Sequence, residues 1–136
     1  MIKKQFTLYL QNTPGVLANV AKVIAKAKVN IEGISVAETT EMSVAQLITS
    51  NAALTRKMLN KAKIPFTAQD VAVFVLDNKP GALAAVAATF AKHGININYL
   101  YATTYGESRS SVVVGADDVK RVEKSWEQDQ SKTARS

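Results

Sequence analysis

The residues best suited to chemistry lie in a short loop motif that occurs twice, Asn-x-Pro-Gly-x-Leu. The first copy runs from Asn12 to Leu17 and the second from Asn78 to Leu83. Each copy stands between a strand pattern and a helix pattern, so the first backbone N–H groups of the helix would converge on an anion such as a carboxylate. The glycine lets a ligand approach closely, and the asparagine amide both donates and accepts hydrogen bonds. Because the same residues also start helices without any ligand, the motif alone leaves a purely structural role open.

The motif is part of a longer internal repeat. Residues 12–31 and 78–97 are identical at eleven of twenty positions, with a constant offset of 66. The repeat indicates two modules of about 65 residues, which are marginal in size alone and are expected to share a core or an interface. The loops differ by one charge, because Lys79 stands where the first copy has Thr13. The two sites therefore need not bind the same molecule.

The hydrophobic pattern predicts the elements of the first module. Alternation of apolar and polar residues predicts a strand at Gln5–Leu10. Helical spacing predicts a helix after Pro14, capped by Asn12 or Thr13, with Leu17 in its buried stripe. The remaining elements are two strands, a helix with Asn51 as its expected N-cap, and a short edge strand, at residues 31–38, 42–50, 51–62 and 64–69.

The second module repeats this order up to its last helix. Its predicted elements are a strand, a helix, two strands and a final helix, at residues 71–76, 81–93, 96–103, 109–115 and from Asp117 or Asp118 onward. No fourth strand is visible, which would leave a sheet edge unpaired. The strand at 71–76 is apolar on both faces, which suggests cover by another chain. Both features favour an oligomer.

The element order is βαββαβ, the ferredoxin-like motif. We therefore predict an α+β fold of two tandem ferredoxin-like modules with antiparallel sheets, the second lacking an evident last strand. The first module is expected at residues 1–69 and the second at 70–126. Residues 127–136 are polar and without periodicity, and are predicted to be a disordered tail.

Composition narrows the function. The net charge is +6, but the lysines are dispersed without an aromatic cluster, so nucleic-acid binding is not favoured. There is no cysteine, and the only histidine, His93, suits the end of a helix, so we predict no catalytic residue, no metal and no cofactor. No apolar run could span a membrane and the chain does not start as a signal peptide does, so we expect a cytoplasmic protein without membrane association.

On these motifs the sequence resembles the ACT domain family, over about residues 4–126. The resemblance rests on the two loops and on the helix ends Val29-Asn30-Ile31 and Gly94-Ile95-Asn96-Ile97. The first copy departs from the family pattern at Lys28, where the family commonly has glycine. A non-glycine residue at this position costs up to about 1 kcal/mol or shifts the end of the helix.

The resemblance implies a non-catalytic module that senses a small molecule, commonly an amino acid, at an interface between paired domains of a homodimer. In such proteins the ligand lies between the loop of one module and the start of the second strand of its partner. The ligand-binding residues implied are Asn12, Thr13, Pro14, Gly15, Val16, Leu17, Asn30, Ile31, Asn78, Lys79, Pro80, Gly81, Ala82, Leu83, Asn96 and Ile97.

The predicted fold is also compatible with other functions. Because the sequence shows no catalytic or DNA-binding domain beside the modules, a sensor of this kind would act on a separate enzyme or regulator. The main alternative is a structural or protein-interaction module of the same fold that binds no ligand. RNA binding through Tyr99 and Tyr101 lacks the glycine-aromatic sheet motif, and an acylphosphatase-like enzyme would need an arginine that both loops lack.

Overall fold

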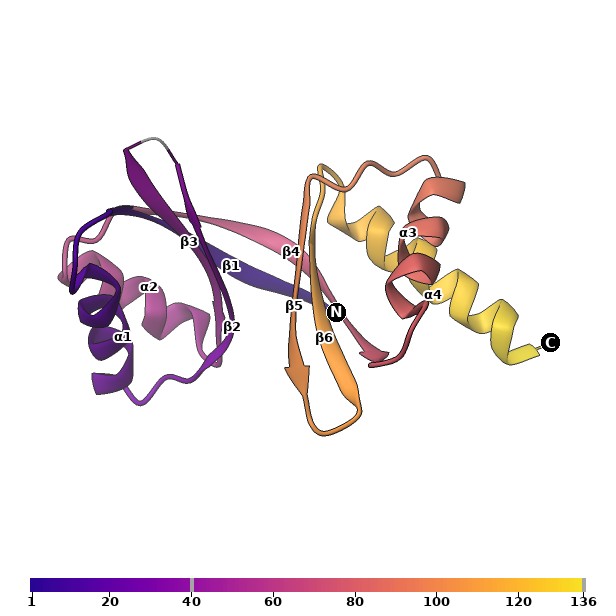
Figure 1. Ribbon diagram of the computed structural model, residues 1–136, viewed down its shortest axis with the longest axis horizontal. Coiled ribbons are helices and arrows are strands. Elements are labelled where there is room, and N and C mark those ends of the chain that lie inside the picture. Colours follow the sequence, from indigo (N-terminus) through magenta and orange to yellow (C-terminus); the bar gives the residue numbers. More distant parts are fainter. Residues whose placement is uncertain (40, 136) are drawn as a thin grey trace. The chain divides into compact units, whose positions relative to one another are not determined.

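The computed structural model describes residues 1–39 and 41–135, apart from the side chains of residues 131–135. The chain divides into two compact units (Figure 1). The first unit is Lys4–Gln69, and the second unit consists of Met1–Lys3 and the chain from Asp70 onward. Each unit has its own hydrophobic core, so each is described separately.

The first unit has the predicted ferredoxin-like order. Its elements are β1 (Ile2–Gln11), α1 (Val16–Lys26), β2 (Ile31–Glu38), β3 (Met42–Thr49), α2 (Ala52–Lys61) and the beginning of β4 (Phe66–Asp77). The strand order is β2-β3-β1-β4, and β3 is antiparallel to both β1 and β2. Helices α1 and α2 cover one face of the sheet (Figure 1).

Alternation along β1 places Phe6 and Leu8 in the core, opposite Leu47 and Ala45 of β3. The predicted cap of α2 is confirmed, because the side chain of Asn51 accepts a hydrogen bond from the amide of Leu54 at 3.0 Å. These contacts fix the sheet from which the first loop departs.

The second unit repeats the arrangement with fewer strands of its own. Its elements are the rest of β4, then α3 (Ala82–Lys92), β5 (Tyr99–Tyr105), β6 (Arg109–Gly115) and α4 (Val119–Arg135). The strand order is β1-β4-β6-β5. The ring of Phe74 lies 5.9 Å from that of Phe90 and 5.5 Å from that of Trp126, so aromatic packing joins the sheet to both helices.

The sheet edge expected to be unpaired in the second unit is paired. The amide of Val73 donates to the carbonyl oxygen of Met1 at 2.7 Å, and the Met1 amino group donates to the Val73 carbonyl at 3.0 Å. Residues Met1–Lys3 thus occupy the place of the missing last strand. The alternation pattern missed them because backbone pairing at an edge does not require apolar side chains.

Two predicted strands, 64–69 and 71–76, form the single strand β4. No glycine, proline or asparagine separates them, so nothing breaks the extended backbone after Pro65. On the face opposite the helices, Val71 is 0% exposed, whereas Val73 and Val75 are half-buried.

The predicted disorder of residues 127–136 is wrong over 127–135, because α4 continues to Arg135. Ser136 lies outside the described residues. The helix continues because Val122 and Trp126 pack on the core and Asp129 contacts α3. None of the described helices has the length and apolar character needed to cross a bilayer.

Candidate functional site

Both Asn-x-Pro-Gly-x-Leu loops have the same backbone conformation. Gly15 has φ 88° and ψ −13°, and Gly81 has φ 89° and ψ −12°. The amide of Val16 donates to the carbonyl oxygen of Thr13 at 3.4 Å, and that of Ala82 to Lys79 at 3.3 Å. A four-residue turn with proline at its second position, and glycine with a positive φ at its third position, is a type II turn.

The expected side-chain cap of the first helix is absent from the described structure. Gly15 and Gly81 are the N-cap residues, and neither helix has a side-chain cap hydrogen bond. The prediction failed because it placed the proline inside the helix, whereas the proline sits in the preceding turn. The first-turn amides of Leu17 and Leu83 have no partner within their helices, so they remain available to an anion.

The first loop borders a cavity of about 180 Å³, here named the first loop cavity. Its lining residues are Leu10, Gln11, Asn12, Thr13, Val16, Leu17, Val36 and Ser43. The amide nitrogen Nδ2 of Asn12 donates to Oε1 of Glu38 at 3.5 Å, which orients the asparagine toward the end of β2.

The second loop borders a cavity of about 140 Å³, the second loop cavity. Its lining residues are Leu76, Asp77, Asn78, Lys79, Ala82, Leu83, Leu100, Ala102, Ser110 and Val112. Sheet register shows that the two cavities correspond, because Leu10 lies opposite Ser43 and Leu76 lies opposite Ser110. Every lining residue of the first cavity has a counterpart in the second.

Each cavity presents an exposed leucine. Leu17 is 43% exposed, so the prediction that it joins the buried stripe of its helix is wrong, and its counterpart Leu83 is 55% exposed. Val20 and Val86, about one turn later in the two helices, are buried. Both leucines lie in the first turn of their helices. They leave apolar surface at the site where a ligand would sit.

The structure separates the predicted site residues into two groups. Asn12, Thr13, Val16, Leu17, Asn78, Lys79, Ala82 and Leu83 line the loop cavities. Pro14, Gly15, Pro80 and Gly81 shape the turns. Asn30, Ile31, Asn96 and Ile97 line neither cavity.

The strand-start residues have other surroundings. The backbone amide of Asn30 donates to the hydroxyl of Ser50 at 2.9 Å. Asn96 lines a third cavity of about 200 Å³ with Gly94, Ile95, Ala116, Asp117, Asp118 and Arg121. Strand β5 begins at Tyr99 rather than at Asn96, because Tyr99 lies opposite Gly115, the last residue of its partner β6. The side chain of Asn96 donates to Asn98, which donates to Asp117.

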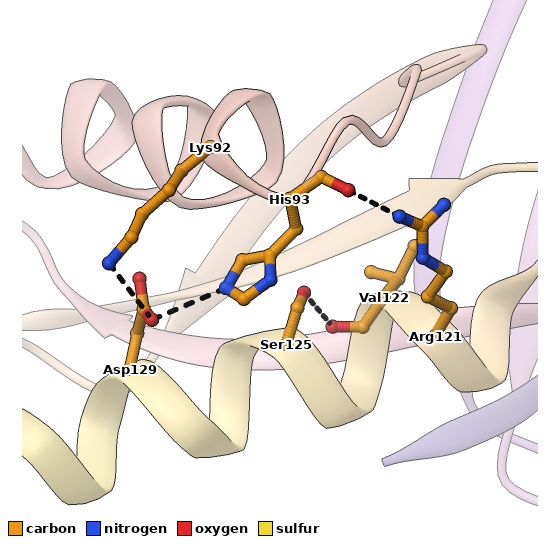
Figure 2. Close-up of polar contacts among 6 residues, drawn as sticks. All are labelled: Lys92, His93, Arg121, Val122, Ser125 and Asp129. Carbon is orange, nitrogen blue, oxygen red and sulfur yellow. Dashed lines mark hydrogen bonds and ion pairs between the residues drawn. The ribbon is translucent and has the colours of Figure 1, made fainter.

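The only histidine belongs to a polar cluster at the end of α3, shown in Figure 2. Nε2 of His93 lies 3.4 Å from Oδ1 of Asp129, and Nζ of Lys92 lies 4.0 Å from the same oxygen. The guanidinium of Arg121 donates to the carbonyl oxygen of His93. The cluster ties α3 to α4 and satisfies a carbonyl at the helix end, which is a structural role.

A hydrogen bond from Thr89 lowers the pKa of Asp129, and the contacts with His93 and Lys92 lower it further. Burial raises the pKa of Tyr101 above its ordinary value, with the neighbouring Tyr99 adding to the effect. Over residues 1–39 and 41–135, no group of three or more histidine, aspartate and glutamate side chains could hold a metal ion.

Sequence reasoning missed the sheet residues of the cavities. Val36, Ala102 and Leu100 come from the second strand of each unit, and Ser43 and Ser110 from the third. Their approach to the loops depends on strand register and on which strand lies beside which. Alternation in the sequence predicts which face of the sheet a residue lies on, but not which strand lies beside it.

Two ferredoxin-like units with corresponding loop cavities define a tandem-module architecture. The family model for an ACT domain pair matches residues 1–128, and the chain belongs to this family. Comparison with curated proteins gives no match. Membership of the family supports a regulatory, ligand-sensing role.

Solved structures show the same fold. A protein from Bacteroides thetaiotaomicron is 25% identical with a TM-score of 0.89, and the match covers 96% of this chain and 90% of that one. The ligand-free regulatory subunit of aspartate kinase from Thermus thermophilus is 17% identical with a TM-score of 0.66, covering 93% and 91%. Aspartate kinase from Clostridium acetobutylicum is 14% identical with a TM-score of 0.60, covering 91% of this chain and 32% of that enzyme.

Proposed function

We propose that this protein is a non-catalytic regulatory protein that senses an amino acid, bound at interfaces between paired modules. The observation that carries the proposal is the pair of corresponding loop cavities, each with an exposed leucine on its lining. A duplicated fold alone would not require both copies to keep the same turn, the same small cavity and the same apolar residue at its mouth.

The chemistry of the loops suits an amino acid. The first-turn amides and the positive end of the helix dipole favour a carboxylate. The asparagine side chain offers an acceptor for an ammonium group and a donor for a carboxylate. Cavities of about 140 and 180 Å³ are smaller than those of drug-sized ligands, so a small metabolite fits better.

An interface completes the proposed site. The loop residues and the strand-start residues Asn30 and Asn96 do not meet at either loop cavity. If both groups contact one ligand, a second module must supply one of them, and a dimer of this chain is the simplest source. The ligand would then stabilise the pairing of modules that binds it more tightly. A separate enzyme or regulator would respond to the resulting change in pairing.

A thermal-shift screen of the full chain with the twenty amino acids tests the proposal. A ligand present at a hundredfold of its Kd adds about 2.7 kcal/mol to the free energy of unfolding. We expect one or a few amino acids to raise the Tm at millimolar concentration. If none does, while circular dichroism shows a folded protein, the proposal fails and a ligand-free interaction module is favoured.

Matched variants locate the site. Ala82→Phe should fill the second loop cavity and Val16→Phe the first, and each should weaken the Tm shift. Ala85→Phe and Ala18→Phe place the same ring on exposed positions of the same helices that line neither cavity, so they should leave the shift unchanged. Light scattering with and without ligand tests the interface, because a monomer that binds fully would contradict it.

A further inference from the structure

The two loop cavities have nearly the same backbone but different charged surroundings. In the second unit Asp77 lies opposite Arg109 across β4 and β6. The Arg109 Nε is 3.7 Å from Oδ1 of Asp77, and the Lys79 Nζ is 4.0 Å from Oδ2. Two cations thus share one carboxylate beside the cavity, and one positive charge remains uncompensated.

The corresponding positions of the first unit carry no charge. Register aligns Asp77 and Arg109 with Gln11 and Met42, which lie opposite each other across β1 and β3. Lys79 corresponds to Thr13 through the repeat. The local positive charge is therefore a property of the second cavity alone.

The first cavity instead has a carboxylate nearby. Glu38, which accepts from Asn12, lies opposite Ser43, and its counterpart opposite Ser110 is the neutral Thr104. The charged side chains that line a loop cavity or contact one of its lining residues sum to −1 in the first unit, from Glu38, and to +1 in the second, from Lys79, Arg109 and Asp77. Lys63 of the first unit lines an adjoining cavity instead.

We propose that the two cavities select ligands of different charge, and that the second takes an amino acid with an acidic side chain. The inference rests on the proposed function. The α-carboxylate of such a ligand meets the first-turn amides of α3, and its second carboxylate meets Lys79, which lines the cavity. The first cavity, with Glu38 nearby, disfavours a second carboxylate and takes a neutral amino acid.

The size of the preference follows from exposure. Lys79 and Asp77 have side chains that are 68% and 64% exposed, so their interactions are screened by water and salt. Exposed ion pairs contribute up to about 1 kcal/mol, which corresponds to about a fivefold change in Kd. The preference should therefore be modest and should weaken as ionic strength rises.

Isothermal titration calorimetry of the full chain at low salt tests the inference with L-glutamate and its neutral isostere L-glutamine. We expect glutamate to bind the second site about fivefold more tightly than glutamine does. Lys79→Thr, which installs the residue of the first loop, should remove that preference and leave glutamine binding unchanged. Thr13→Lys makes the reciprocal change and should strengthen glutamate binding at the first site.

The outcomes separate the two proposals. If glutamate and glutamine bind equally to the unaltered chain, or Lys79→Thr weakens both equally, the charge inference is overturned while amino-acid sensing stands. If no amino acid binds at all, the proposed function fails and the inference fails with it. Both variants lie at exposed loop positions, and far-ultraviolet circular dichroism verifies their folding.

Discussion

In each unit a glycine lies opposite a large side chain near the start of the second strand. The glycine is on the second strand in the first unit and on the third strand in the second unit. In the first unit Gly33 of β2 lies opposite Ile48 of β3. In the second unit Tyr99 of β5 lies opposite Gly115 of β6. The repeat aligns Gly33 with Tyr99, and strand register aligns Ile48 with Gly115.

The difference shows what the fold requires at this point. A Cβ atom on Gly115 would clash with Cζ of Tyr99, so the tyrosine ring occupies the space of the missing side chain. Ile48 is 3% exposed in the first unit, where the glycine stands on the other strand. The sheet thus accommodates one large residue per pair, and either strand can supply it.

Gly115→Ala should have the largest effect of the substitutions considered next. The added methyl group forces the Tyr99 ring out of its place, which should lower the free energy of unfolding by about 1–3 kcal/mol. Chemical denaturation monitored by circular dichroism measures the loss.

A double-mutant cycle with Tyr99→Ala isolates the cause. In the Tyr99→Ala background, Gly115→Ala should cost much less, because the ring is no longer there to displace. Equal costs in the two backgrounds would show that the ring is not the reason for the glycine.

An intermediate effect is expected where the first helix of each unit ends. Lys28 has φ 59° and Gly94 has φ 67°, and the amide of each donates to the third residue before it, at 2.9 and 3.0 Å. Lys28→Gly should stabilise the protein by up to about 1 kcal/mol, and Gly94→Ala should destabilise it by about the same amount.

Crowding does not explain the second effect, since the nearest atom to a Cβ on Gly94 is Nη2 of Arg121 at 4.0 Å. Lys28→Ala is the matched control, because it removes the lysine side chain without relieving the left-handed backbone. A gain in Tm from Lys28→Ala as large as that from Lys28→Gly would assign the effect to the side chain instead.

The smallest effect concerns a contact that the second unit alone has. Ala27 corresponds to His93 through the repeat, so the first unit lacks the contact between His93 and Asp129. Because the folded pKa of Asp129 is lowered, its carboxylate stabilises the fold above the ordinary aspartate pKa of about 3.9. This contribution is lost as the pH falls through the lower, folded pKa.

Asp129→Asn should therefore have a slightly lower Tm than the unaltered protein at neutral pH, and the difference should shrink in acid. Thermal melts across this pH range measure it. A difference that stays constant as the pH falls below the folded pKa would mean that the charge of Asp129 is not involved.

Local patterns predicted most of the fold. Alternation of residue types specifies the strand at Ile31–Glu38. The cap at Asn51 depends on a hydrogen bond to a residue only three positions later, so the local sequence specifies it as well. The continuity of β4 was missed because the polar pair Gln69-Asp70 interrupts the apolar pattern without turning the backbone. A polar pair within an apolar pattern therefore does not by itself mark the end of a strand.

The site was predictable only in its loops. Asn12 and Lys79 stand out because the motif repeats, whereas strand register brings Arg109 and Glu38 to Asp77 and Asn12, which line the cavities. The prediction placed Leu17 in the core because helical spacing assigns a face of the helix but not the exposure of each turn. The charge difference between the cavities therefore required the structure.

The pairing of Met1 with Val73 has a consequence for how the protein folds. The amide of Tyr9 donates to the carbonyl oxygen of Pro65 at 3.2 Å, in the same antiparallel register as the Met1–Val73 pair. The two residues are 72 positions apart, but folding of the first unit already places β1 beside β4 and so brings them together. During synthesis the first unit can therefore assemble first, and the pairing of Met1 with Val73 then extends an existing strand pair without a further loop-closure cost.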